Sequence, residues 1–228
     1  MTNQNHTTTA AELNTSATTG KSIATINGLF PTPISTAKRD TDLSPKEEKE
    51  IEKIVEEGMY KSTGNSISNN SYIFNDKFKK IKQFCEQQLK IYVERVINPK
   101  KELDFYITQS WLNVTKPGEF HHHHSHPNSI ISGVFYILTE EDDKITFTDT
   151  NHKIKELIKF EMKEYNLWNS ITWFFPSNNN ELLLFPSWLQ HQVEVNEKAT
   201  TDRISISFNT FVRGNLGREH DLTELILK

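Results

Sequence analysis

Short apolar runs recur along the chain from about residue 103 to the C-terminal region. They are rich in aromatic and β-branched residues, and turn-forming stretches such as EEDD, PSNNN and NEKATTD separate them. Runs of this composition, bounded by turn residues, are typical of β-strands. The predicted strands are LDFYITQSWLNVT, SIISGVFYIL, KITFTD, ITWFFP, ELLLFP, HQVEVN and RISISFNTFV.

Two segments ahead of the strands repeat apolar residues with helical spacing. In LSPKEEKEIEKIVEEGM, Ser44 is the expected N-cap, Pro45 takes the first helical position and Glu47 completes a capping box. The second helix is expected over DKFKKIKQFCEQQLKIYVERVI. Its apolar stripe consists of Phe78, Ile81, Cys85, Leu89, Tyr92 and Val96. Helices followed by seven or more strands predict helices packed on a β-sandwich or barrel.

The domain organisation follows from the same pattern. Residues 1–22 are rich in Thr, Asn and Ser with few apolar side chains, so they are expected to form a disordered tail. Residues 23–228 are expected to form a single domain. Within it, residues 23–99 supply a first strand and the helices, and residues 100–228 supply the β-core. An insert at about 151–170 lacks clear periodicity and is expected to be partly helical around KELIKFEMKEY.

Charge and composition narrow the classes of partner. The formal net charge is −4, which does not favour nucleic acid as a partner. No apolar run reaches the roughly 18–20 residues of a membrane helix, so no membrane association is expected. The single cysteine, Cys85, cannot form an internal disulfide, and a cytoplasmic protein is the expectation (the host cytoplasm if a phage encodes it). A homodimer is left open.

Histidines provide the main chemical signal. Five of the nine lie between His121 and His126, in the stretch GEFHHHHSHPNSIISGVFYIL. Alternate side chains of a strand share one face, so an H-x-H pair can converge on one metal ion. The stretch contains three such pairs: His121/His123, His122/His124 and His124/His126.

A third ligand has to come from elsewhere in the chain. His191, in LLLFPSWLQHQVEVN, is the best candidate because it lies at a turn that leads into a strand. His152 and His220 are expected to be ordinary structural histidines. His121, His122 and His123 are either exposed or orient the metal ligands through hydrogen bonds.

A second polar pair lies about a dozen residues after His191. In DRISISFN, Arg203 and Ser205 alternate with apolar residues and therefore share the opposite face of a strand. A guanidinium inside a barrel needs an anion, and it binds a carboxylate through two parallel hydrogen bonds. A structural ion pair with Glu194 or Asp202 is the alternative for Arg203.

The combined pattern SWLN…HHSHPNSIISGVFYIL…ELLLFPSWLQHQVEVN…RISISFN resembles the 2OG-Fe(II) oxygenases of bacteria and their phages. The resemblance runs from about Gly28 through the C-terminal region. It implies a double-stranded β-helix of the jelly-roll or cupin type, in an α+β, mainly β fold with the two N-terminal helices on one sheet. It also implies a dioxygenase that uses Fe(II), 2-oxoglutarate and O₂, releases succinate and CO₂, and most simply hydroxylates its substrate.

The resemblance assigns roles residue by residue. His124, His126 and His191 match the metal ligands and catalytic centre. Arg203 and Ser205 match the pair that binds the distal carboxylate of 2-oxoglutarate, and Tyr136 stands where relatives often offer a hydroxyl to it. The substrate class, a small molecule or a protein side chain, is left open.

One position departs from the wider superfamily, whose usual ligand set is two histidines and one carboxylate. Here the middle position is His126, and neither Glu119 nor Asp149 has the spacing to supply the carboxylate. Two rival functions therefore stay open. One is a cupin-like three-histidine metalloenzyme that does not use 2-oxoglutarate, and the other is a non-catalytic barrel that binds a metal or ligand.

Overall fold

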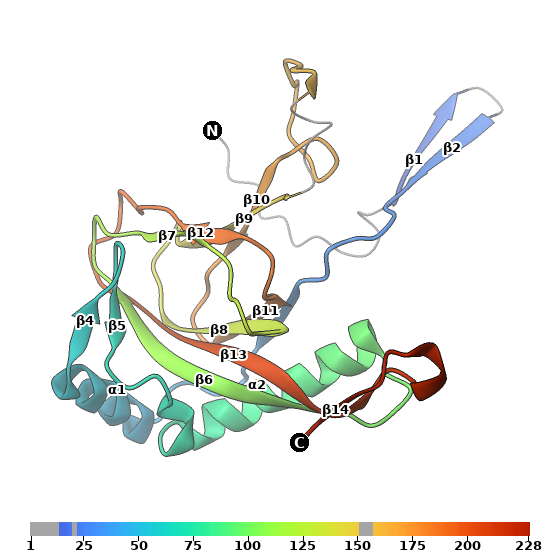
Figure 1. Cartoon of the computed structure of the whole chain (residues 1–228). Helices are drawn as coiled ribbons and strands as arrows, with labels where there is room; N and C mark the ends of the chain where they lie inside the picture. Colours follow the sequence, from blue (N-terminus) through green and yellow to red (C-terminus); the bar gives the residue numbers. More distant parts are fainter. Residues whose placement is uncertain (1–13, 20–21, 151–156) are drawn as a thin grey trace. The chain divides into compact units, whose positions relative to one another are not determined.

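The structure is a computed structural model that describes residues 14–19, 22–150 and 157–228 (Figure 1). The chain divides into two compact units, and residues 33–159 and 171–228 form the larger one. In the smaller unit, β1 (Asn14–Thr19) and β2 (Ser22–Asn27) pair as an antiparallel hairpin. Most of the expected tail lies outside the described residues, so the tail stays a prediction, as do the domain limits.

Two antiparallel sheets build the larger unit. The larger sheet has the strand order β3-β11-β8-β13-β6-β5-β4, and β14 pairs with the end of β13. Its strands are β3 (Ser35–Lys38), β4 (Met59–Lys61), β5 (Ser66–Ser68), β6 (Asp104–Thr115), β8 (Ile131–Leu138), β11 (Glu181–Pro186), β13 (Arg203–Leu216) and β14 (Leu225–Leu227). The smaller sheet has the order β10-β9-β12-β7. Its strands are β7 (His121–His124), β9 (Lys144–Thr148), β10 (Thr172–Pro176) and β12 (His191–Val193).

The first helix begins where the sequence predicts, whereas the second begins three residues after the start of the predicted segment, and Val96 of its expected apolar stripe is 44% exposed. Helix α1 (Pro45–Glu57) starts at Ser44, and both hydrogen bonds of the capping box with Glu47 are present. Helix α2 (Lys79–Tyr92) continues into one π-helical turn (Val93–Ile97). Short 3₁₀ turns lie at Ile73–Asn75 and Glu219–Asp221. No helix of the described residues is long and apolar enough to span a membrane.

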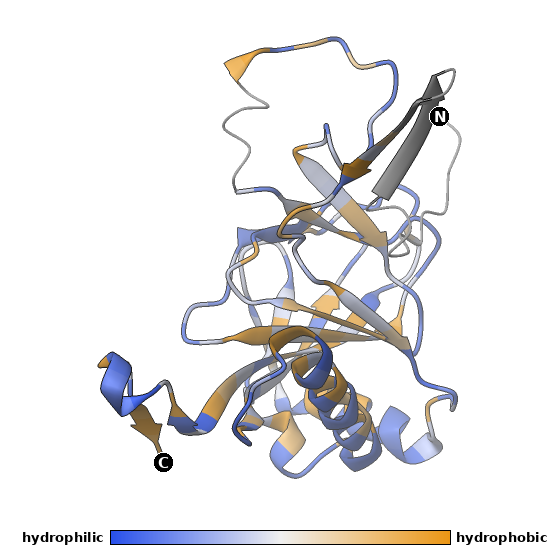
Figure 2. Cartoon of the chain, turned by 90° about the vertical axis from the view of Figure 1, so that its right-hand side faces the viewer, coloured by the Kyte–Doolittle hydropathy of each residue, from blue (hydrophilic) through white to orange (hydrophobic). Residues whose placement is uncertain are grey.

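Two hydrophobic layers lie on the two faces of the larger sheet. The layer on the helix side contains Ile54, Ile81, Cys85, Leu89, Leu112, Phe135, Leu182, Ile206 and Phe208. The layer on the other face contains Val134, Tyr136, Ile145, Phe147, Leu183, Phe185 and Leu189. Figure 2 shows the helices beneath the sheet with mixed hydrophilic and hydrophobic colouring, as expected when one face of a helix is buried.

Strand alternation explains how the site is positioned. On β8, Phe135 and Ile137 belong to the layer on the helix side, whereas Val134 and Tyr136 belong to the layer on the opposite face. The predicted mainly β fold with two helices on one sheet is confirmed. The β4–β5 hairpin and β14 were not predicted. Of the insert expected to be partly helical, residues 151–156 lie outside the described residues, and residues 158–165 are not helical.

Gly133 has no side chain at the point where the ring of Phe208 packs against the backbone of β8. A Cβ added at Gly133 would lie 2.1 Å from Cζ of Phe208, whose residue pairs with Gly133 across β8 and β13. Overpacking of this kind costs roughly 1–3 kcal/mol. We expect Gly133→Ala to lower the Tm by roughly 2–12 °C, given about 2–4 °C per kcal/mol for a chain of this size.

Thermal unfolding followed by circular dichroism measures this effect. Combining Gly133→Ala with Phe208→Leu removes the ring and should cost less than the sum of the two single changes. Additive losses would show that the close approach of Gly133 to the ring is not the cause.

Candidate metal centre and adjoining pocket

The pairing of β7 with β12 brings two distant histidines together. His191, the first residue of β12, pairs with His124, the last residue of β7, and their ring centroids are 4.4 Å apart. His126 lies beyond the end of β7, where its backbone N–H donates to the carbonyl of Ser187 at 2.9 Å. Its ring centroid is 5.1 Å from that of His191. One candidate ligand atom from each of the three rings lies within 4.8 Å of the others.

Hydrogen bonds orient each of the three rings in the same way. Nδ1 of His124 lies 2.7 Å from the carbonyl oxygen of His122, and Nδ1 of His191 lies 3.0 Å from that of Leu189. Nδ1 of His126 lies 2.6 Å from Oδ1 of Asn209. A carbonyl or amide oxygen only accepts, so Nδ1 of each ring must carry the proton. The lone pair is therefore on Nε2, the tautomer that a metal ligand of this kind needs.

The burial and protonation of these three imidazoles suit the binding of a divalent cation. Nε2 of His126 is buried and has no hydrogen-bond partner among the described residues. The pKa of His124 is lowered to about 4, mainly by burial and also by nearby imidazoles, although the hydrogen bond to the carbonyl of His122 opposes these effects. Burial also lowers the pKa of His126 and lowers that of His191 well below the usual value. Neutral rings with free Nε2 atoms are what metal binding requires.

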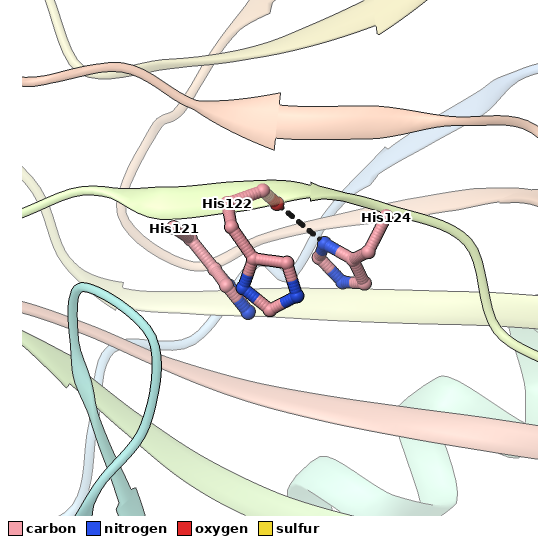
Figure 3. Close-up of side chains that lie close together, drawn as sticks. All are labelled: His121, His122 and His124. Atoms are coloured by element: carbon pink, nitrogen blue, oxygen red, sulfur yellow. Dashed lines mark hydrogen bonds between the residues drawn. The ribbon is translucent and has the colours of Figure 1, made fainter.

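The other histidines of the cluster are placed differently. Figure 3 shows His121, His122 and His124 side by side along β7, with the bond from Nδ1 of His124 to the carbonyl of His122. His121, His122 and His124 form a second group whose candidate ligand atoms lie within 4.8 Å of one another. His123 is exposed, and its Nε2 lies 2.9 Å from Oγ1 of Thr148. His122 thus orients His124 through its backbone carbonyl.

The remaining candidates do not reach these rings in the described structure. His220 is exposed in a 3₁₀ turn, and His152 lies outside the described residues. Glu119 forms an ion pair with Lys61. Neither three-residue metal group found among the described residues contains a carboxylate.

A pocket adjoins the histidines. The imidazoles of His124, His126 and His191 line it together with Arg203, Ser205, Ser207, Asn65 and Asn113. Trp111, Phe185, Val134 and Ile145 supply apolar walls. The ring of Trp111 stacks on that of His126 at 5.9 Å, and Phe185 is 2% exposed, whereas Trp188 is 55% exposed.

Arg203 is a buried cation at this pocket, with 8% of its surface exposed. Its Nη1 donates a long hydrogen bond of 3.5 Å to the carbonyl of Lys144, and its guanidinium lies over the ring of Tyr136 at 5.3 Å. Glu194, one of the partners considered from the sequence, instead pairs with Lys144. The described structure records no ion pair for Arg203 with either Glu194 or Asp202.

The other two expected co-substrate residues lie close to Arg203. Ser205 is 5% exposed, lines the pocket and pairs with Tyr136 across β13 and β8. Tyr136 is 1% exposed and is not among the residues that line the pocket. Burial raises the pKa of Tyr136, although the charge of Arg203 and the nearby Ser177 oppose this. The hydroxyls of Tyr136 and Ser177 are buried, and neither has a hydrogen-bond partner of good geometry within the described part of the chain.

Two further residues of the site were not predicted. Asn209 orients His126, and it also accepts from Oγ of Ser132 at 3.1 Å. The alternation of Arg203, Ser205, Ser207 and Asn209 along one strand was the available signal. Asn65, in the turn between β4 and β5, is fully buried, and neither Oδ1 nor Nδ2 has a partner among the described residues.

The comparisons with known proteins agree with this architecture. Residues 109–209, which run from β6 to β13, match the model of the family described as "Putative 2OG-Fe(II) oxygenase". The β-core is therefore similar to the 2OG-Fe(II) oxygenase family over this segment, which is somewhat less than half of the chain. The matched residues include the histidine cluster, His191, Arg203 and Asn209. No curated protein matches the chain.

Solved structures show that the chain has the fold expected from the sequence. The alpha ketoglutarate-dependent carbocyclase SnoK from nogalamycin biosynthesis is 12% identical with a TM-score of 0.55, and the match covers 81% of each chain. A Pseudomonas putida prolyl-4-hydroxylase is 15% identical with a TM-score of 0.52, over 80% of this chain and 94% of the other. A prolyl hydroxylase from Trichoplax adhaerens, in complex with a peptide fragment, is 12% identical with a TM-score of 0.52, over 78% and 83%. The predicted jelly-roll core is therefore confirmed.

Proposed function

We propose that this chain is a 2OG-Fe(II) oxygenase that binds Fe(II) through His124, His126 and His191 and hydroxylates its substrate. The observation that carries the proposal is the convergence of three imidazoles, each with Nδ1 facing an oxygen acceptor, in the same pocket as a buried guanidinium. Overall, one substrate C–H bond, 2-oxoglutarate and O₂ give a C–OH group, succinate and CO₂. Bound Fe(II) supplies the activation of O₂ that is coupled to decarboxylation of 2-oxoglutarate.

The residues of the chain have the following roles. Three neutral imidazoles leave the double charge of the cation uncompensated, which favours binding of a dianionic co-substrate. Arg203 binds its distal carboxylate through two parallel hydrogen bonds, and Ser205 adds a third. Tyr136 stacks against Arg203 and holds it in place. Trp111 and Phe185 exclude water from the reacting atoms.

The substrate is proposed to be a small molecule or a peptide side chain. Related folds include a carbocyclase of nogalamycin biosynthesis and prolyl hydroxylases, one of them bound to a peptide fragment. A chain whose lone cysteine, Cys85, is free and buried is compatible with the cytoplasm as the site of action.

The function is tested by two measurements on the metal-free and Fe(II)-loaded protein. Fe(II)-loaded protein should form succinate from 2-oxoglutarate in air, and calorimetry under anaerobic conditions should show 2-oxoglutarate binding that depends on the metal. Substrate candidates are then ranked by how much they stimulate succinate formation. Metal binding without 2-oxoglutarate binding would instead favour the three-histidine metalloenzyme or the non-catalytic barrel.

Asn65 is proposed to bind the substrate, because its amide lines the pocket with both polar atoms unpaired. A buried polar group without partners costs roughly 1–3 kcal/mol. We expect Asn65→Leu to raise the Tm of the ligand-free protein by about 2–4 °C for each kcal/mol recovered. Differential scanning calorimetry gives the shift.

Asn113 provides a matched control in the same pocket. Its amide donates to Ser207 at 2.9 Å and accepts from Nε1 of Trp111 at 3.2 Å. Asn113→Leu leaves both partners unpaired and should lower the Tm. A loss of stability in Asn65→Leu would contradict the proposed role, because the amide would then already be satisfied in the free protein.

A further inference from the structure

The strand that carries the histidine cluster contains an irregularity beside the metal centre. His191 pairs with His124 and Val193 pairs with His121, so two steps along β12 correspond to three steps along β7. This is a β-bulge, which adds one residue to one strand and changes the direction of the side chains that follow. In a regular strand, His121 and His124 would face opposite sides.

The bulge places His121 on the same side as His124. Their ring centroids are 4.5 Å apart and the rings are stacked. His122, two residues before His124, has its ring centroid 4.8 Å from that of His124 and 5.3 Å from that of His121. Figure 3 shows the three rings grouped on one side of β7. The group therefore depends on a specific backbone feature as well as on the run of histidines.

His124 belongs to both groups of three histidines. Its Nδ1 is engaged with the carbonyl of His122 at 2.7 Å, so only Nε2 has a lone pair to offer. One lone pair cannot bind two cations. The two groups therefore cannot hold a cation at the same time. One group consists of His121, His122 and His124, and the other consists of His124, His126 and His191.

The two groups differ in their access to water. His191 is 5% exposed, and Nε2 of His126 is buried although the residue as a whole is partly exposed. His121 and His122 are both partly exposed, and neither has a buried ring nitrogen without a partner among the described residues. Nδ1 of His122 lies near the carbonyl of Thr63 in the β4–β5 turn, at 3.4 Å. A hydrated cation arriving from solvent can exchange water for His121 and His122 before it reaches the buried rings.

We propose that His121, His122 and His124 form a second, outer position for a divalent cation, which competes with the inner centre for His124. Its occupants are cations with high affinity for imidazole, such as Zn²⁺ or Cu²⁺, which bind such sites more tightly than Fe²⁺ does. A cation at the outer position holds His124 away from the inner centre. The outer position goes beyond the proposed oxygenase function and needs neither 2-oxoglutarate nor turnover.

The experiment isolates the outer position by removing the inner one. In the double variant His126→Gln/His191→Gln, two inner ligands are lost and all three outer histidines are kept. Co²⁺ alone is the probe, followed by its visible absorption and by equilibrium dialysis. We expect one equivalent to bind. Adding His122→Ala or His121→Ala should weaken binding at least about tenfold, since losing even an outer-shell partner costs roughly 10–100-fold.

The matched control is His123→Ala in the same double variant, because His123 lies on the same strand but outside both groups. It should leave Co²⁺ binding unchanged.

Wild-type protein should bind one equivalent, since His124 cannot serve two cations. The proposal is overturned if the folded double variant binds no Co²⁺, if His123→Ala weakens binding as much as His122→Ala, or if the wild type binds two equivalents. Circular dichroism establishes folding, and His126→Ala/His191→Ala is the second background if the glutamine pair does not fold.

Discussion

Replacing His191 by alanine is expected to abolish iron-dependent succinate formation and to weaken metal binding at the inner centre by at least about 100-fold. His191 is the only one of the three inner ligands that comes from outside the His121–His126 cluster. Its Nδ1 is held by the carbonyl of Leu189, so its Nε2 is directed by the backbone of the turn before β12. His124 and His126 alone cannot close the inner centre, because two protein ligands rarely form a stable site.

The measurements are succinate formation in air and anaerobic Fe(II) binding by calorimetry, the latter in a background carrying His121→Ala and His122→Ala so that the outer position cannot bind the cation. His220→Ala is the matched control, because His220 is exposed and lies in a separate 3₁₀ turn. It should bind Fe(II) and turn over 2-oxoglutarate like the wild type. Normal succinate formation by a folded His191→Ala variant would show that His191 is not a ligand of the catalytic metal.

The residues proposed for this centre could be selected from the sequence because their signals are local. The spacing of His124 and His126 and the alternation of Arg203 with Ser205 can be seen in a few residues. His191 was recognisable by its place at the start of a strand after a turn. The capping box of Ser44 and Glu47 likewise depends on residues three positions apart.

Features that depend on pairing between distant segments were not predictable in this way. The bulge opposite His191 and Val193 exists only once β7 and β12 are in register. Asn209 becomes an orienting residue because the fold brings Oδ1 of this β13 residue to within 2.6 Å of Nδ1 of His126, which is 83 positions away in the sequence. The β4–β5 hairpin is made of two three-residue strands, which are too short to show an alternating pattern.

The buried positive charge of Arg203 needs a compensating anion. A buried cation is costly unless it is paired, and the described residues give Arg203 one long hydrogen bond and an aromatic ring. The pocket beside it is the natural place for the compensating anion. Ser205, which also lines the pocket, provides a hydroxyl for the same anion.

Replacing Arg203 by alanine is therefore expected to weaken 2-oxoglutarate binding by about 2–5 kcal/mol, or roughly 30-fold to several thousand-fold. Binding of Fe(II) alone should change little, because none of its proposed ligands is altered. Arg203→Lys should fall in between, since an ammonium keeps the charge but loses the two parallel hydrogen bonds. Calorimetry with 2-oxoglutarate and the dependence of succinate formation on its concentration measure both effects.

Arg213→Ala is the control on the same strand, because Arg213 is exposed and lies over Tyr106 at 3.7 Å. If Arg203→Ala bound 2-oxoglutarate like the wild type, the guanidinium would have a structural role and the three-histidine enzyme without 2-oxoglutarate would gain support.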